Sequence, residues 1–203
     1  MEVSLRIRGW ACGWTIAVGL VRTAHAYSTG PPDERTGAPG ETSCMCHMSK
    51  GPATALGLDI HGPAAYGLGS MINLSVSLES FGKQRWGFEL TVLDAMDQPV
   101  GTVIRVDESR TQLSRALNGR QYLKHTATGT DLGTPDAAPG WAFAWLAPSQ
   151  PAGPVTFYAA GVGANGNGFN TGDLVYDARL TVPEGPTNVA PTTWSAVRSL
   201  YRR

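Results

Sequence analysis

Short runs in which apolar and polar residues alternate recur along most of this chain, and they constrain its fold more than any other feature. Alternation puts apolar side chains on one face of a strand and polar side chains on the other, as in half-buried antiparallel sheets. The runs are Leu56–Ile60, Ile72–Leu78, Trp86–Val92, Val100–Val106, Trp141–Trp145, Val155–Ala160 and Leu174–Val182. With 25 Gly and 14 Pro, turns are frequent. We therefore predict an all-β, Ig-like antiparallel β-sandwich with Trp86, Trp141 and Trp145 in its core.

Two segments break the alternation. In Ser109–Gly119, the residues Leu113, Ala116 and Leu117 have helical spacing, which predicts one helical turn. Residues 184–203 read as a linker followed by a short basic amphipathic tail, for which we predict a short C-terminal helix. The sandwich domain is therefore expected to occupy residues 56–183.

Residues 1–26 have the three parts of a secretory signal peptide in order. Arg6 and Arg8 precede an apolar stretch from Trp10 to Val21, and Ala24-His25-Ala26 forms an A-x-A cleavage site before Tyr27. The apolar stretch is too short for a membrane span, which needs ~20 residues. We expect an exported protein that is periplasmic, extracellular or on the cell surface, with no membrane span after cleavage.

The charge of the mature chain argues against two classes of partner. Removing residues 1–26 leaves 13 basic and 15 acidic residues, a net charge of about −2. That balance does not favour nucleic acid or an anionic membrane surface. A redox protein or a cell-surface component is the expected partner. The sequence also contains no catalytic motif, so we do not predict an enzyme.

Residues 27–55 form an extended Gly- and Pro-rich segment that contains the run Cys44-Met45-Cys46-His47-Met48. Thiols attach haem or bind soft metals, and histidine is a common axial ligand. A short cysteine motif that ends in Cys-His is typical of c-type haem attachment, usually C-x-x-C-H. Here the spacing is C-x-C-H, one residue shorter.

Several segments in one order resemble the bacterial exported "choice-of-anchor V" proteins, whose β-sandwich is similar to the reeler domain. They are Thr36–Glu41, Arg85–Leu90, Tyr122–Thr126, Trp141–Trp145, Val155–Gly161 and Asn165–Gly168 with Gly172-Asp173. The resemblance covers about Thr36 to Val182. It implies an exported reeler-like sandwich with a Cys/His segment at its N-terminal edge and a variable C-terminal sorting tail, and it implies no known enzyme.

The family's motif has the form T-C-x-x-C-H. Aligned with Thr42–His47, it matches at Cys46 and His47, while Ser43 takes the place of the first cysteine and Cys44 falls on a spacer position. The shift argues against attachment through two thioethers and leaves attachment through Cys46 possible.

Our first hypothesis is a monohaem c-type electron carrier. Cys46 would bond the haem, with Cys44 as a second candidate, and His47 would be the proximal iron ligand. His125 is the preferred distal ligand, and Met48 and His61 are weaker alternatives. A haem would supply the redox chemistry, while the protein would set its potential.

Two further hypotheses remain open. The Cys44–Met48 run offers sulfur and imidazole to Cu(I). A surface adhesion or structural module without a cofactor would also account for the export signal and the sandwich. Separately, Asn165, Asn167 and Asp173 resemble a weak calcium loop, although Asn-Gly pairs more often form tight turns.

Overall fold

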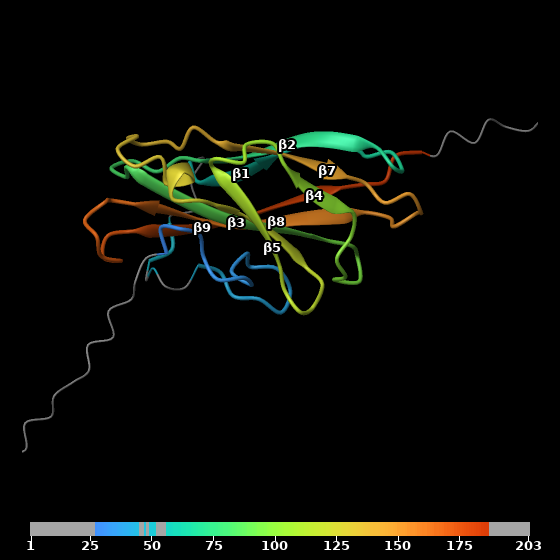
Figure 1. The fold of residues 1–203 in the computed structure, drawn as a ribbon, viewed down its shortest axis with the longest axis horizontal. Helices are drawn as coiled ribbons and strands as arrows, with labels where there is room; N and C mark the ends of the chain where they lie inside the picture. Colours follow the sequence, from blue (N-terminus) through green and yellow to red (C-terminus); the bar gives the residue numbers. More distant parts are fainter. Residues whose placement is uncertain (1–26, 45–46, 48, 52–55, 187–203) are drawn as a thin grey trace, which may run out of the picture.

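The computed structural model describes residues 27–44, 47, 49–51 and 56–186, and within them the chain forms two antiparallel sheets packed face to face (Figure 1). The four-stranded sheet has the order β1 (Leu58–His61), β2 (Met71–Leu78), β7 (Trp141–Leu146) and β4 (Thr102–Arg105). The five-stranded sheet has the order β5 (Thr111–Arg115), β6 (Gln121–His125), β3 (Arg85–Leu93), β8 (Val155–Ala164) and β9 (Leu174–Val182). A 3-10 turn, η1 (Thr128–Thr130), is the sole helical element of the described residues. The predicted β-sandwich is confirmed. The predicted leader and C-terminal helix lie outside the described residues.

Aromatic side chains fill the space between the two sheets. Trp86, Trp141 and Trp145 are fully buried, as predicted. The Trp145 ring meets Phe157 edge-on at a centroid distance of 5.5 Å, which joins β7 to β8 across the core. Each indole N–H donates to a backbone carbonyl, so none of these three tryptophan nitrogens is buried without a partner. These rings dominate the packing between the sheets.

The predicted helical turn in Ser109–Gly119 is wrong, because residues Thr111–Arg115 form strand β5. β5 pairs with β6 through a hairpin whose turn contains Gly119 at φ +82°. In that turn the Gly119 N–H donates to the Ala116 carbonyl at 3.0 Å. Leu117, which gave the run its helical spacing, lies exposed at the hairpin tip. The Asn-Gly pair is therefore a hairpin signal here and not a helix stop.

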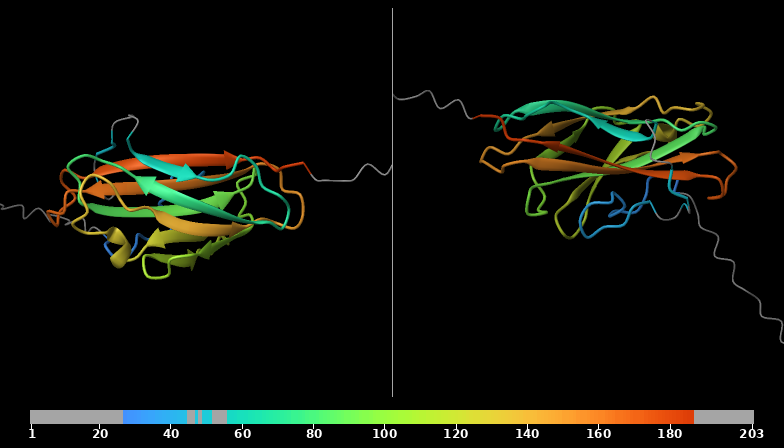
Figure 2. Two further views of the ribbon diagram at one scale, coloured as in Figure 1. Left: turned by 90° about the horizontal axis from the view of Figure 1, so that it is seen from above. Right: turned by 180° about the vertical axis from the view of Figure 1, so that it is seen from behind.

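The N-terminal segment, residues 27–44, lies across the outer face of the five-stranded sheet (Figures 1 and 2). Strand β3 shows the effect of this cover, because every residue from Trp86 to Leu93 is buried. Its inward side chains belong to the sandwich core, and its outward ones lie under the N-terminal segment. The sheet is thus covered on both faces at β3, although it is antiparallel.

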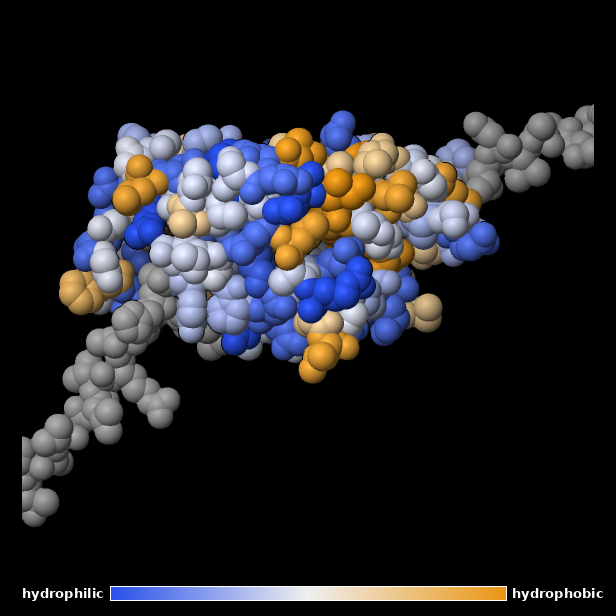
Figure 3. Space-filling view, viewed as in Figure 1, coloured by the Kyte–Doolittle hydropathy of each residue, from blue (hydrophilic) through white to orange (hydrophobic). Residues whose placement is uncertain are grey.

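The face of the molecule in Figure 3 is mostly hydrophilic, and apolar side chains gather over the half that carries β4 and β7. Met71 and Leu146 are opposite each other in the β2–β7 register, and both are exposed. Single exposed apolar side chains of this kind are common on soluble domains.

Candidate functional site

A buried carboxylate fixes the N-terminal segment to the sheet just before the Cys/His run. The Glu41 side chain is 1% exposed, and its oxygens accept hydrogen bonds from the Thr36 hydroxyl at 2.5 Å, the Arg120 guanidinium at 2.6 Å and the Tyr122 hydroxyl at 2.8 Å. Positive φ angles at Gly37 and Gly40 form the tight loop that brings Thr36 and Glu41 together. The Thr36–Glu41 segment therefore positions the chain that follows it.

On the far side of the Cys/His run, the chain is tied to β9. Lys50 forms a parallel bridge with Val175, and the Gly51 N–H donates to the Val175 carbonyl at 2.8 Å. The Lys50 ammonium also lies 3.1 Å from Asp177, to which the Ser43 hydroxyl donates a hydrogen bond. The described residues on either side of the run, Ser43 and Lys50, are thus both held beside Asp177 of β9.

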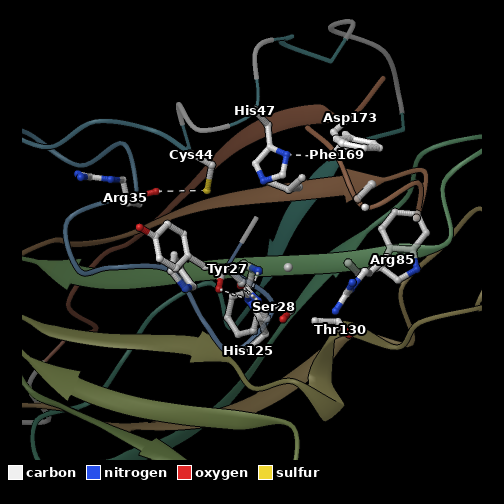
Figure 4. A pocket seen from close by; sticks show the side chains of 18 of the residues that line it. Tyr27, Ser28, Arg35, Cys44, His47, Arg85, His125, Thr130, Phe169 and Asp173 are labelled. Carbon is white, nitrogen blue, oxygen red and sulfur yellow. Dashed lines mark hydrogen bonds and ion pairs between the residues drawn. The ribbon is translucent and has the colours of Figure 1, made fainter. Parts of the chain in front are cut away.

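A pocket lies between this segment and the outer face of the five-stranded sheet (Figure 4). The empty space in the pocket, together with the adjoining open solvent, is about 770 Å³. Its lining comprises Tyr27, Ser28, Pro31, Pro32, Arg35, Cys44, His47, Arg85, Trp86, Gly87, Phe88, His125, Thr130, Val162, Ala164, Gly166, Gly168, Phe169 and Asp173. Most of these residues are apolar or small, so the pocket suits a largely apolar ligand.

His47 is oriented by a buried carboxylate. Its Nδ1 lies 2.8 Å from Oδ2 of Asp173, whose side chain is 1% exposed. The other carboxylate oxygen of Asp173 accepts the Asn165 N–H at 3.0 Å, which fixes the carboxylate in turn. Figure 4 shows the second ring nitrogen of His47 directed into the pocket. Ligating histidines are held in this way, with one nitrogen bonded to a carboxylate and the other presented to the metal.

Cys44 lies on the same wall of the pocket as His47. The residue is buried, and its thiol donates to the Arg35 carbonyl at a sulfur–oxygen distance of 3.7 Å. It packs in a small apolar cluster with Ala160 and Val162 of β8. Cys44, which falls on a spacer position of the family motif, thus lines the pocket, whereas Ser43 is turned to Asp177.

His125 reaches the pocket from β6 and is 6% exposed. Its Nδ1 lies 3.0 Å from the Phe88 amide nitrogen and 3.2 Å from the Phe88 carbonyl oxygen, and its Nε2 lies 3.2 Å from the Tyr27 carbonyl oxygen. Burial lowers the pKa of His125, although the carbonyls of Phe88 and Tyr27 oppose this effect. Both ring nitrogens are therefore engaged by the backbone.

Small residues on the outward face of β3 and β8 form the pocket floor. Gly87 makes room for His125, because a Cβ at this position would lie 2.8 Å from the His125 ring. Val162 is opposite Gly87 in the β3–β8 register, and Ala164 is opposite Arg85. A larger side chain at Gly87 would displace the imidazole.

Beneath the N-terminal segment, Glu89 is fully buried on the outward face of β3. Its Oε2 accepts the Arg35 N–H at 2.6 Å, while Oε1 is the one buried side-chain polar atom of the described residues without a hydrogen-bond partner. The Lys124 ammonium lies 3.8 Å from Oε1 and is itself paired with Asp33. Burial raises the pKa of Glu89 to about 8, and the Arg35 N–H and Lys124 offset only part of the increase.

The structure thus brings together Cys44, His47 and His125 at one pocket, although His125 is 78 positions from His47 in the chain. His61 lies elsewhere, exposed on β1, where its Nε2 is 2.8 Å from the Ser77 hydroxyl. Cys46 and Met48 are outside the described residues. In the part of the chain that is described, no three His, Cys, Asp or Glu residues are grouped to hold a metal ion.

The oxygens of the predicted calcium loop are used in turn contacts. Asn165 Oδ1 accepts the Asn167 N–H, and Asn167 Oδ1 accepts the Phe169 N–H. Both carboxylate oxygens of Asp173 are also occupied, one by Asn165 and one by His47. The loop therefore places Asp173 beside His47, a role that the sequence analysis missed.

Other residues of the pocket were also not assigned to a site from the sequence. Tyr27 and Arg85 are two of them, although Arg85 begins the segment Arg85–Leu90 that resembles the family. The predicted cleavage site before Tyr27 was the available signal for that residue, because cleavage there would make Tyr27 the first residue of the mature chain.

No protein-family model matches the chain, and no curated protein matches it. Among solved structures, it is similar to the reeler domain of human F-spondin, with 18% identity, a TM-score of 0.44 and coverage of 65% of this chain and 96% of that one. It is also similar to a cohesin module from a Clostridium perfringens family 33 glycoside hydrolase, with 12% identity, a TM-score of 0.44 and coverage of 65% and 98%. It is similar as well to an uncharacterized protein from Nocardia farcinica with an immunoglobulin-like fold. That match has 12% identity and a TM-score of 0.41, and it covers 64% of this chain and 99% of the other.

At these identities and TM-scores the similarity concerns the fold alone, and the described residues form a two-sheet antiparallel β-sandwich. Among the residues that the structure describes, no helix has the length and apolar character needed to cross a membrane.

Proposed function

We propose that this protein is an exported electron carrier that holds one haem covalently. Cys46 is the attachment residue, Cys44 is a second candidate, and His47 is the axial ligand. The observation that supports this most directly is the His47–Asp173 pair, in which Nδ1 is bound at 2.8 Å and the other ring nitrogen points into the pocket.

The residues around His47 suit an iron-porphyrin in polarity. Val162 and Ala164 of β8 add apolar surface to the pocket lining, which suits a flat apolar group. Arg35 and Arg85 add positive charge to its lining, which suits the acidic groups of a porphyrin. When bound, the haem would supply one-electron redox chemistry.

The protein's own residues have separate tasks in this proposal. Asp173 holds the His47 ring and fixes its tautomer, because a buried carboxylate accepts the Nδ1–H. The Thr36–Glu41 loop and the Lys50–Val175 bridge hold both ends of the Cys/His run against the sheet. Phe169, 68% exposed at the pocket, keeps part of the site close to solvent, where a redox partner can approach.

Intact mass measurement tests the proposal. The protein is expressed with its leader in a host that has c-type haem maturation, and the secreted chain is expected to be heavier by one haem. Cys46→Ser should abolish the covalent gain, and Cys44→Ser shows whether a second thioether forms. Cys12→Ser is the matched control, because Cys12 lies in the segment expected to be removed.

Two results would contradict the haem proposal. A protein with free thiols at both positions and no Soret band carries no haem. If it then binds Cu(I) in competition with a chelator, the Cys/His run handles copper. If it binds neither, the sandwich is a surface or structural module without a cofactor.

A further inference from the structure

Three ionisable side chains meet beneath the N-terminal segment, and none of them lines the pocket. Lys124 of β6 and Glu89 of β3 are directly opposite each other in the register of these strands, so both side chains leave the same face of the sheet. Asp33 approaches from the N-terminal segment, and its carboxylate pairs with the Lys124 ammonium. The Lys124 side chain is 9% exposed and that of Glu89 is fully buried, so the cover shields this group from most of the solvent.

Neighbouring groups hold the Lys124 nitrogen and the Asp33 carboxylate in contact. Lys124 Nζ donates to Oδ1 of Asp33, and it also donates to the Pro31 carbonyl at 2.8 Å. The Ser114 hydroxyl of β5 donates to the same oxygen of Asp33. Two reacting groups that are held in a productive orientation reach effective molarities of about 10⁵–10⁸ M. Such contact favours an amide bond, which free amines and carboxylates in water do not form.

Glu89 is placed to carry the protons that this reaction has to move. Its Oε2 accepts the Arg35 N–H at 2.6 Å, whereas Oε1 lies 3.8 Å from Lys124 Nζ and has no hydrogen-bond partner among the described residues. Burial raises the pKa of Glu89 to about 8, and the charges of Asp33 and Glu41 add to the increase. The side chain is therefore a carboxylic acid at neutral pH, and a group that exchanges its proton near this pH suits general acid–base catalysis.

We propose that Lys124 and Asp33 join through an isopeptide bond between Nζ and Cγ, and that Glu89 is the catalytic residue that transfers the protons. The Lys124 ammonium gives one proton to the Asp33 carboxylate, and the lone pair of the neutral amine then attacks Cγ. Glu89 takes a second proton from Nζ as the C–N bond forms, and its own proton goes to the departing oxygen. That oxygen leaves as water with the electron pair of the C–O bond, while the Ser114 hydroxyl stabilises the charge that develops on Oδ1. One ammonium and one carboxylate thus become one amide and one water, and nothing is oxidised or reduced.

The bond would fasten the N-terminal segment permanently to β6. It joins positions that are 91 residues apart in the chain, and a cross-link that closes a long loop stabilises a protein mainly by restricting its unfolded state. Unlike a disulfide, it needs no oxidant to form and no oxidising compartment to persist. Because none of the three side chains lines the pocket, this inference does not depend on the proposed haem.

Peptide mapping of the secreted wild-type chain tests the bond. The denatured protein is digested with trypsin, which cuts after lysine only where the side-chain amine is free. We expect no cleavage after Lys124. We also expect a branched peptide that joins the segments of Asp33 and Lys124 and is lighter by one water than the two segments together. The readout is the same with or without haem.

Lys124→Arg keeps the positive charge but cannot form the bond, because a guanidinium stays protonated. This variant and Asp33→Ala should give no branched peptide. Glu89→Gln keeps the shape of the side chain without its acid, and most of its Lys124 should remain cleavable by trypsin. The matched control is Lys50→Arg, which alters the exposed ion pair of Lys50 with Asp177, and it should give the branched peptide in the same yield as the wild type.

A wild-type chain that trypsin cuts fully after Lys124 contains no such bond and overturns the inference, and this measurement requires no variant to fold. A branched peptide in equal yield from Glu89→Gln and the wild type overturns the catalytic role of Glu89. Either result leaves the haem proposal intact, because that proposal is read from the covalent gain at Cys46.

Discussion

Replacing Glu89 with glutamine should change how the stability of this protein depends on pH. Glu89 is fully buried, Oε1 has no hydrogen-bond partner among the described residues, and burial raises the pKa from 4.5 to about 8. Between these two pH values the folded protein keeps the proton and the unfolded chain has lost it. The contribution of the protonated Glu89 side chain to the free energy of unfolding is then fully present below pH ~4.5. It is lost as the pH rises toward 8.

The size of the effect follows from the same two values. Each pH unit in that window lowers the free energy of unfolding by about 1.4 kcal/mol, so the loss reaches at most about 5 kcal/mol at pH 8. The amide that Glu89→Gln introduces cannot ionise, and any constant penalty for burying it does not depend on pH. The difference in unfolding free energy between wild type and Glu89→Gln therefore isolates the carboxyl group.

Urea unfolding of both proteins at intervals from pH 5 to pH 9 measures that difference. We expect it to move by several kcal/mol in favour of the variant as the pH rises. Glu79→Gln is the control, because Glu79 is exposed on the surface and its replacement should leave the pH slope unchanged. A difference that stays constant over the whole range would show that Glu89 is ionised throughout and paired with Lys124, and would refute the reasoning.

Asp173→Asn should leave the fold intact but remove the negative charge that holds the His47 ring. We therefore expect a shifted haem spectrum and a shifted reduction potential, which a redox titration measures. Identical potentials in the variant and the wild type would contradict the role assigned to Asp173. Gly87→Ala places a methyl group 2.8 Å from the His125 ring, and it should lower the free energy of unfolding by about 1–3 kcal/mol in thermal or urea melts. Gly67→Ala, whose Cβ would meet only ordinary contacts, serves as its control, and equal effects of the two would disprove the clash.

Seven of the nine strands in the described residues could be predicted from alternation, because one face of each buries apolar side chains. β6 could not, since Lys124 and His125 are polar and yet buried under the N-terminal segment. A cover built from hydrogen bonds and ion pairs, such as Lys124 with Asp33, leaves no apolar pattern in the strand beneath it. β5 was hidden for a related reason, because it is a short edge strand with one apolar residue facing the core.

The residues of the candidate site also divide into those that the sequence could identify and those that it could not. Cys44, His47 and His125 carry chemically distinctive side chains, so they could be chosen from the sequence before anything placed them in one pocket. Asp173 could not be assigned to His47, because 126 positions separate them and only the approach of the β8–β9 loop to the Cys/His run makes the pair. Local spacing identifies chemical groups, whereas the register of distant strands decides which groups meet.

The direction of β9 decides which end of the domain a C-terminal tether would hold. Asp173, at the pocket, directly precedes β9, while Glu184 follows its far end, and a strand of nine residues spans about 30 Å. Figure 1 shows the β8–β9 loop and the last described residues at opposite ends of the molecule. Any tether made downstream of Pro186 would therefore hold the domain at the end opposite the β8–β9 loop, and it would leave that loop and Asp173 away from the point of attachment.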